Sequence, residues 1–184
     1  MMNERSATLI GVQQNVLDEC IRGIYYSRRC SQFTPQNHSV FLKSCLTKMV
    51  VVQWCQLFGR RSEDIHWTKV ELGTDYPRFD RSHILVSTGL SLPEWVDYHG
   101  HMLRLRDKFF AHFDLDSLHD NIPSFDPALK ILLSYRGWML ITVDKAVELG
   151  YVAQRGFPDS DILIRNIHHE LDFIGAHWEP LSQP

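Results

Sequence analysis

The sequence predicts an all-α fold, a helical bundle in a single domain over residues 1–184. Apolar residues recur at three- and four-residue steps in the long segments, which is the spacing of an amphipathic helix. No segment shows the polar–apolar alternation that is typical of a strand. No repeat, low-complexity tract or linker divides the chain, so we expect one bundle of about four to five main helices.

The first half of the chain predicts two long helices. An apolar stripe over residues 9–28 indicates the first, which should end near the arginine pair that closes it. The second, capped by Ser39, is apolar nearly all round until Gly59 ends it, so we expect it to be central. After Gly59, glycines and prolines leave room only for short helices, near residues 65–70 and 80–88.

Three more helices are expected in the second half. Pro93 suits the first turn of the third main helix, whose apolar positions extend over residues 95–113. Pro127 opens the fourth, and Gly150 stops it. A last helix is predicted over residues 160–176.

Composition limits the classes of function. A net charge of -3 gives no sequence-wide reason to bind nucleic acid or anionic membranes, so a polyanion would need a local basic patch. The four cysteines lack the spacing of a zinc site or a disulfide scaffold, and we expect reduced, mostly buried thiols. No apolar signal-peptide core or membrane span is recognisable, which favours a cytoplasmic protein.

Arg106 occupies an unexpected place on the third main helix. At about 100° per residue, it points along the centre of the apolar arc, between Leu103 and Met102. Burying an unpaired guanidinium costs several kcal/mol, so Arg106 needs a carboxylate, a phosphate or a water-filled cleft in front of it. One alternative is therefore purely structural, with Asp64 or Glu94 as the buried acid.

His112 lies at the end of the same predicted helix, on the border of its polar face, where we expect solvent to reach it. An imidazole takes or returns a proton near neutral pH, and an arginine one to two turns away stabilises charge on a phosphate. The two side chains together suffice for phosphodiester cleavage without a metal. The alternative is a histidine that is favoured by the dipole at the helix C-terminus.

The string Arg-Asp-Lys-Phe-Phe-Ala-His over residues 106–112 resembles the catalytic motif of the HEPN superfamily, an arginine followed several residues later by a histidine. In that family a polar residue typically follows the arginine, and Asp107 fits this pattern. Segments 54–59 and 62–67 also resemble the branch associated with abortive-infection systems. The similarity then extends over roughly residues 40–149.

The resemblance implies a metal-independent endoribonuclease of toxin or phage-defence type, without a cofactor, that acts as a homodimer with both motifs facing a shared cleft. In the family's usual mechanism the 2′-hydroxyl of RNA attacks the adjacent phosphate and leaves a 2′,3′-cyclic phosphate. On this chain His112 would be the acid and base, Arg106 the phosphate ligand and Asp107 the residue that orients them, with an antitoxin protein as a further partner. Residues expected to bind the substrate are Lys108, Arg104, His99 and Arg136, and Asp64, His66 and Trp67 are candidates to line the pocket.

Two other hypotheses stay open. A HEPN-like module without activity could serve as a dimeric interaction or nucleotide-sensing domain; the net acidity favours it, whereas the intact Arg106 and His112 favour the enzyme. A small-molecule or metal-binding bundle is the third, but the i, i+2 spacing of His99 and His101 disfavours joint chelation on a helix. Arg136 either faces the same cleft as Arg106 or satisfies an internal carboxylate.

Overall fold

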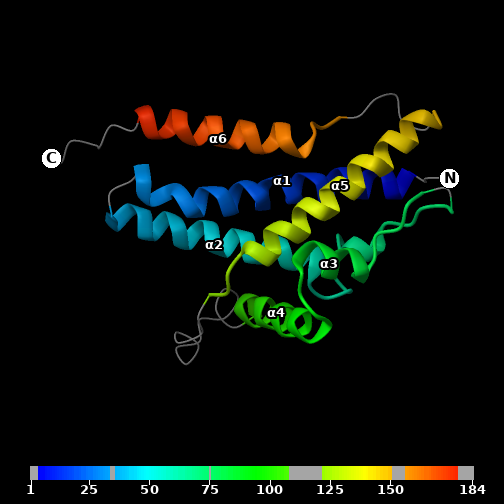
Figure 1. Ribbon diagram of the computed structural model, residues 1–184, viewed down its shortest axis with the longest axis horizontal. Coiled ribbons are helices and arrows are strands. Elements are labelled where there is room, and N and C mark those ends of the chain that lie inside the picture. Colours follow the sequence, from blue (N-terminus) through cyan, green and yellow to red (C-terminus); the bar gives the residue numbers. More distant parts are fainter. Residues whose placement is uncertain (1–3, 34–35, 75, 108–121, 151–155, 178–184) are drawn as a thin grey trace.

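Long helices lie side by side along the molecule (Figure 1). The computed structural model describes residues 4–33, 36–74, 76–107, 122–150 and 156–177. Helix α1 (Glu4–Phe33) and helix α2 (Gln36–Phe58) form an antiparallel hairpin, and α6 (Ser160–His177) packs along α1. Helix α5 (Asp126–Glu148) crosses this layer diagonally. The described ranges hold six α-helices and no strand, which confirms the predicted all-α bundle.

Three shorter elements lie near the C-terminal end of α2. They are the single 3₁₀ turn η1 (Trp67–Lys69), α3 (Arg81–Thr88) and α4 (Leu92–Arg104). Helix α3 packs on α5, whereas α4 packs on α2. Beyond α4 the chain continues through residues 105–107 as a wider, π-helical turn, a geometry that is frequent at functional sites.

Local signals set several helix ends as predicted. The Asp80 carboxylate accepts hydrogen bonds from the backbone N–H groups of Ser82 and His83, at 2.8 and 3.4 Å, and so caps α3. Gly89 ends α3 in the left-handed conformation (φ 74°), which glycine adopts without strain. Pro93 lies in the first turn of α4, where its missing N–H costs nothing.

The α1–α2 hairpin departs from the prediction on both sides of its turn. Helix α1 continues beyond Arg28 because buried Cys30 extends its apolar stripe, while Arg28 points outward and pairs with Asp126 of α5 at 2.5 Å. Helix α2 already begins at Gln36, so Ser39 is not its N-cap. Ser39 is instead buried, and its carbonyl accepts a hydrogen bond from the Cys30 thiol at 3.7 Å.

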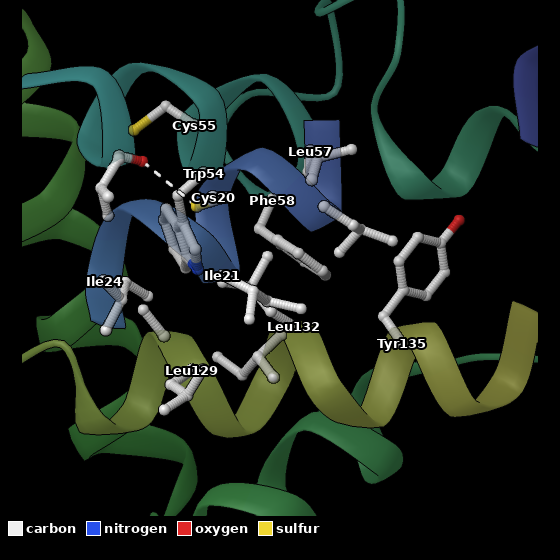
Figure 2. Packing of buried hydrophobic residues seen from close by; sticks show 14 of the residues in the cluster. Cys20, Ile21, Ile24, Trp54, Cys55, Leu57, Phe58, Leu129, Leu132 and Tyr135 are labelled. Atoms are coloured by element: carbon white, nitrogen blue, oxygen red, sulfur yellow. Dashed lines mark hydrogen bonds between the residues drawn. The ribbon is translucent and has the colours of Figure 1, made fainter. Parts of the chain in front are cut away.

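The core sits where α1, α2 and α5 meet, as Figure 2 shows. Trp54 and Phe58 of α2 pack between Ile21 of α1 and the Leu132 and Tyr135 side chains of α5, and all five are at most 1% exposed. Each such side chain contributes roughly 1.5–3 kcal/mol through burial. The C-terminal half of α2 is therefore the central element that its sequence predicts.

The cysteines agree with the expectation of reduced, mostly buried thiols. All four cysteines are free thiols, and only Cys45 is exposed. None of the described helices combines the length and the apolar character that crossing a lipid bilayer requires.

Candidate functional site

Arg106 lies in the wide turn that follows α4, and two carboxylates hold its guanidinium. Its Nη1 donates to Glu63 Oε1 at 2.6 Å, and its Nε donates to Asp107 Oδ1 at 2.8 Å. Nη2 of Arg60 donates to the other Asp107 oxygen at 2.6 Å. We call these four residues, Arg60, Glu63, Arg106 and Asp107, the Arg106 cluster. Arg106 was expected to face a carboxylate, a phosphate or a water-filled cleft. The described residues supply the carboxylate.

The two acids that were expected beside Arg106 are the wrong ones. Glu94 accepts hydrogen bonds from the backbone N–H and the hydroxyl of Ser91, at 2.8 and 2.6 Å, and caps α4. Asp64 is exposed and lines a different hollow, beside the first turns of α1. Its neighbour Glu63 faces Arg106, because turns closed by Glu63 N–H to Arg60 O and His66 N–H to Glu63 O orient this connection.

The Arg106 cluster is partly open to water. The exposed side-chain fractions are 58% for Arg60, 30% for Glu63, 16% for Arg106 and 36% for Asp107. Burial alone would lower the pKa of Arg106, but the hydrogen bond to Asp107 and the neighbouring negative groups raise it above its usual value. Arg106 is therefore a permanent cation. Its Nη2 has no hydrogen-bond partner within the described part of the chain.

Cys55 of α2 adjoins this cluster and stays a neutral thiol. Burial raises its pKa to about 12, and the opposing effect of the Arg106 charge is smaller. The thiol donates to the Met102 carbonyl, with a sulfur–oxygen distance of 3.6 Å. Because only the thiolate is a strong nucleophile, Cys55 is a packing residue of the site rather than a reactive one.

His99 and Arg104 lie upstream on α4. Nε2 of His99 lies 2.9 Å from the Phe58 carbonyl and 3.2 Å from the Gly59 carbonyl, and since carbonyl oxygens only accept, Nε2 carries the proton. His99 is seven residues before Arg106, on the same helix face and about 10 Å away along the axis. Arg104 is exposed, and its two-residue separation from Arg106 turns it to another face.

Arg136 is bound inside the fold. Its side chain is 0% exposed, and its Nε donates to Asp18 of α1 at 2.9 Å. Its Nη1 donates to the Ser160 hydroxyl at 3.0 Å and its Nη2 to the Pro158 carbonyl at 2.8 Å. Of the two alternatives for this residue, the internal carboxylate is the one observed, and none of its partners belongs to the Arg106 cluster.

Two of the expected site residues fall outside the described ranges. They are Lys108 and His112, so the proximity of His112 to Arg106 stays a prediction. As for metals, no group of three or more His, Cys, Asp or Glu side chains in the described ranges is arranged to hold an ion.

Sequence reasoning missed Arg60 and Glu63 as members of the site. Both belong to the charged run that directly follows the buried end of α2. A charged run at the end of a buried helix lies next to whatever packs on that end, here α4. The place of this charged run in the sequence was therefore the signal that could have identified Arg60 and Glu63 as site residues.

No family model matches the sequence, and comparisons with curated proteins and with solved structures give no match either. The HEPN resemblance therefore depends on the motif and the two upstream segments alone. Function has to be argued from the Arg106 cluster and its surroundings.

Proposed function

We propose that the chain is a metal-independent endoribonuclease of the HEPN type, in which Arg106 binds the scissile phosphate and His112 is the acid and base. The observation that supports this most directly is that Nη2 of Arg106 has no hydrogen-bond partner among the residues that the structure describes. Asp107 and Glu63 hold Nε and Nη1, so the guanidinium keeps one orientation, and its Nη2 donors are the ones that we propose for the phosphate. A donor fixed in advance stabilises phosphate charge without reorganisation.

The proposed reaction needs only protons and the substrate's own hydroxyl. The His112 imidazole accepts the proton of the 2′-hydroxyl, and the 2′-oxygen forms a bond to the adjacent phosphorus. The bond from phosphorus to the 5′-oxygen breaks, and the leaving oxygen takes a proton from an imidazolium. The products are a 2′,3′-cyclic phosphate and a 5′-hydroxyl, while Arg106 offsets the charge on the phosphate oxygens.

A homodimer through α4 is part of the proposal. Leu92, Val96, His99 and Leu103 recur at three- and four-residue steps along this helix, and Leu92 and Val96 are 46% and 60% exposed. A second copy that covered this stripe would bring two Arg106 cations to one cleft. Such an effector would be paired in the cell with an antitoxin protein.

The second candidate is a HEPN-like module without activity, which serves as a dimeric interaction or nucleotide-sensing domain. The observation that favours it is the charge balance of the Arg106 cluster, where two carboxylates already face two guanidinium groups. A phosphate would have to share Arg106 with Glu63 and Asp107. RNA cleavage separates the two candidates.

The test is cleavage of labelled structured and unstructured RNAs by the purified chain in the presence of EDTA, with analysis of the product ends. His112→Ala should slow cleavage by at least about a hundredfold, because acid–base help is lost. Arg106→Ala should also impair it. His169→Ala and Arg165→Ala, exposed positions on α6, are the matched controls and should cleave like the parent.

Two results would decide against the enzyme. One is full cleavage by both site variants; the other is activity that EDTA abolishes and a divalent ion restores. A parent that cleaves no RNA but sediments as a dimer supports the second candidate.

A further inference from the structure

A basic hollow, distinct from the Arg106 cluster, lies next to it. It has a volume of about 230 Å³ and opens between the end of α2, the connection to η1, the start of α3 and α4. The polar side chains and indole rings that line it are Arg61, His66, Trp67, Arg81, Trp95 and His99, and Phe58 closes it from α2. The connection at residues 60–66 serves both places, since Arg60 and Glu63 turn to the Arg106 cluster while Arg61 and His66 line the hollow.

The charge of the hollow differs from that of the Arg106 cluster. No Asp or Glu lines it. Arg61 and Arg81 are exposed, and neither forms a salt bridge within the ranges that the structure describes. The two guanidinium groups come from different elements and face one small space without a counter-charge. An anion supplies that counter-charge, and a phosphate does so with geometry that suits arginine.

The surroundings of His66 agree with a site for an anion. Burial first, and then the charges of Arg61, His99 and Lys69, together lower the pKa of His66 to about 4, so positive groups converge on this ring. His66 is neutral near pH 7, and its Nδ1 accepts from the Thr68 N–H at 3.2 Å. Because Nε2 of His99 donates to two carbonyls, Nδ1 of the neutral ring is an acceptor, and it can take a hydrogen bond from an N–H or O–H group of a ligand rather than bind the phosphate itself.

Two indole rings, those of Trp67 and Trp95, line the hollow. Trp67 is half-buried beside His66, with a distance of 5.6 Å between the ring centroids, and the edge of Trp67 meets Phe79. Trp95 lies 5.4 Å from the His99 ring. Pockets for drug-sized ligands measure about 300–1,000 Å³, so this hollow suits one small ring with a charged group rather than a long segment of polymer. Aromatic side chains next to cationic ones are how proteins hold single nucleotides.

We propose that this hollow binds one nucleotide unit, with its phosphate between Arg61 and Arg81 and its base against Trp67. The unit is either a free mononucleotide or one residue of an RNA strand, since both present the same phosphate and base. Arg61, Arg81 and Trp67 have no part in the proposed cleavage at Arg106. Binding here is therefore measured separately from nuclease activity, although Val96 and His99 of the hollow also belong to the α4 stripe of the proposed homodimer.

Binding is tested by calorimetry and tryptophan fluorescence with the full chain in low salt. The probes are adenosine monophosphate, adenosine, inorganic phosphate and a 2′-O-methyl adenine trinucleotide, which the proposed cleavage cannot consume. We expect the mononucleotide to bind at least about tenfold more tightly than adenosine or phosphate, because it engages both the arginines and the indole. A trinucleotide that binds tighter still identifies an RNA strand as the source, and equal affinity identifies the free nucleotide.

Variants assign the binding to this hollow. Arg61→Ala/Arg81→Ala should weaken mononucleotide binding at least tenfold, and Trp67→Leu should remove the advantage over inorganic phosphate. Arg78→Ala is the matched control, because Arg78 is also exposed and forms no salt bridge within the described ranges, but lines a different hollow that Trp67 borders as well. Circular dichroism verifies that each variant is folded. Absence of binding at millimolar mononucleotide, or an equal loss in Arg78→Ala, overturns the proposal.

Discussion

Arg136 and Arg106 are both arginines on the inner side of a helix, and both are held by carboxylates, but they differ in what they leave free. Every nitrogen of the Arg136 guanidinium has a partner, namely Asp18, Ser160 or Pro158, and the side chain is 0% exposed. Arg106 is 16% exposed, and the described residues bind only two of its three nitrogens.

The difference separates a structural arginine from one that can act on a ligand. The partners of Arg136 come from α1 and from the chain around the start of α6, so its bonds join three parts of the fold. The partners of Arg106 are a connecting segment and its own neighbour, which orient it without enclosing it. A closed set of bonds favours stability, and an incomplete one leaves a donor for substrate.

Replacing Arg136 should produce the largest effect on folding. Arg136→Met leaves Asp18, 22% exposed, without its buried counter-charge, and we expect a loss of about 3–5 kcal/mol in the free energy of unfolding. Urea unfolding measures this, with Arg165→Met on the surface of α6 as the control, expected within about 0.5 kcal/mol of the parent. Equal free energies of unfolding for Arg136→Met and Arg165→Met would show that Arg136 is not a structural arginine.

Arg106→Met should affect stability less. Glu63 and Asp107 are 30% and 36% exposed, so water can solvate them, and Arg60 remains beside Asp107. We expect a loss of about 1–2 kcal/mol in urea unfolding, together with the loss of any RNA cleavage. Destabilisation as large as that of Arg136→Met, with cleavage retained, would make Arg106 a second structural arginine.

The periodicity of apolar residues predicted the helices well, because their three- and four-residue spacing in the local sequence determines which side of a helix is buried. Pro93 in the first turn of α4 and the short helix near residues 80–88 were predicted and are confirmed, and in the structure the Asp80 side chain and the left-handed backbone of Gly89 mark the ends of that short helix. The α1–α2 turn was misjudged because burial of Cys30 and Ser39 depends on contact between the two helices.

The candidate site was only partly predictable for a related reason. The helical wheel placed Arg106 on the inner side of its helix, where it lies. It could not distinguish Glu63 from Asp64, since side-chain directions in an irregular connection follow its turns rather than a period. Asp18, the carboxylate partner of Arg136, is more than a hundred residues away in sequence, so no local sequence pattern could identify it.

Glu63→Gln makes the comparison sharper by changing one charge. The amide keeps a hydrogen-bond acceptor for Arg106 but removes a negative charge, so stability should change by less than about 1 kcal/mol. Affinity for RNA should rise and depend more steeply on salt, because one more cation is available to phosphate. Filter binding across a salt series measures this, with Glu71→Gln, another exposed acid, as the control. Unchanged affinity and salt slope would mean that RNA does not reach Arg106.

The smallest expected effect concerns Arg61, which unlike Arg136 and Arg106 faces no carboxylate in the described ranges. Burial and then the Arg61 charge lower the pKa of His66 from 6.5 to about 4. The fold thus favours the neutral imidazole, whereas the unfolded chain takes up a proton near pH 6.5, so stability falls as the pH drops from about 6.5 towards 4. Arg61→Gln should raise the His66 pKa in the folded chain, so the loss of stability still begins near pH 6.5 but ends at a higher pH and is smaller. The pKa is measured from the imidazole proton resonances in NMR titrations, and Arg78→Gln should leave it unchanged. A His66 pKa that ignores Arg61 would show that burial alone sets it and that positive charge does not converge on this hollow.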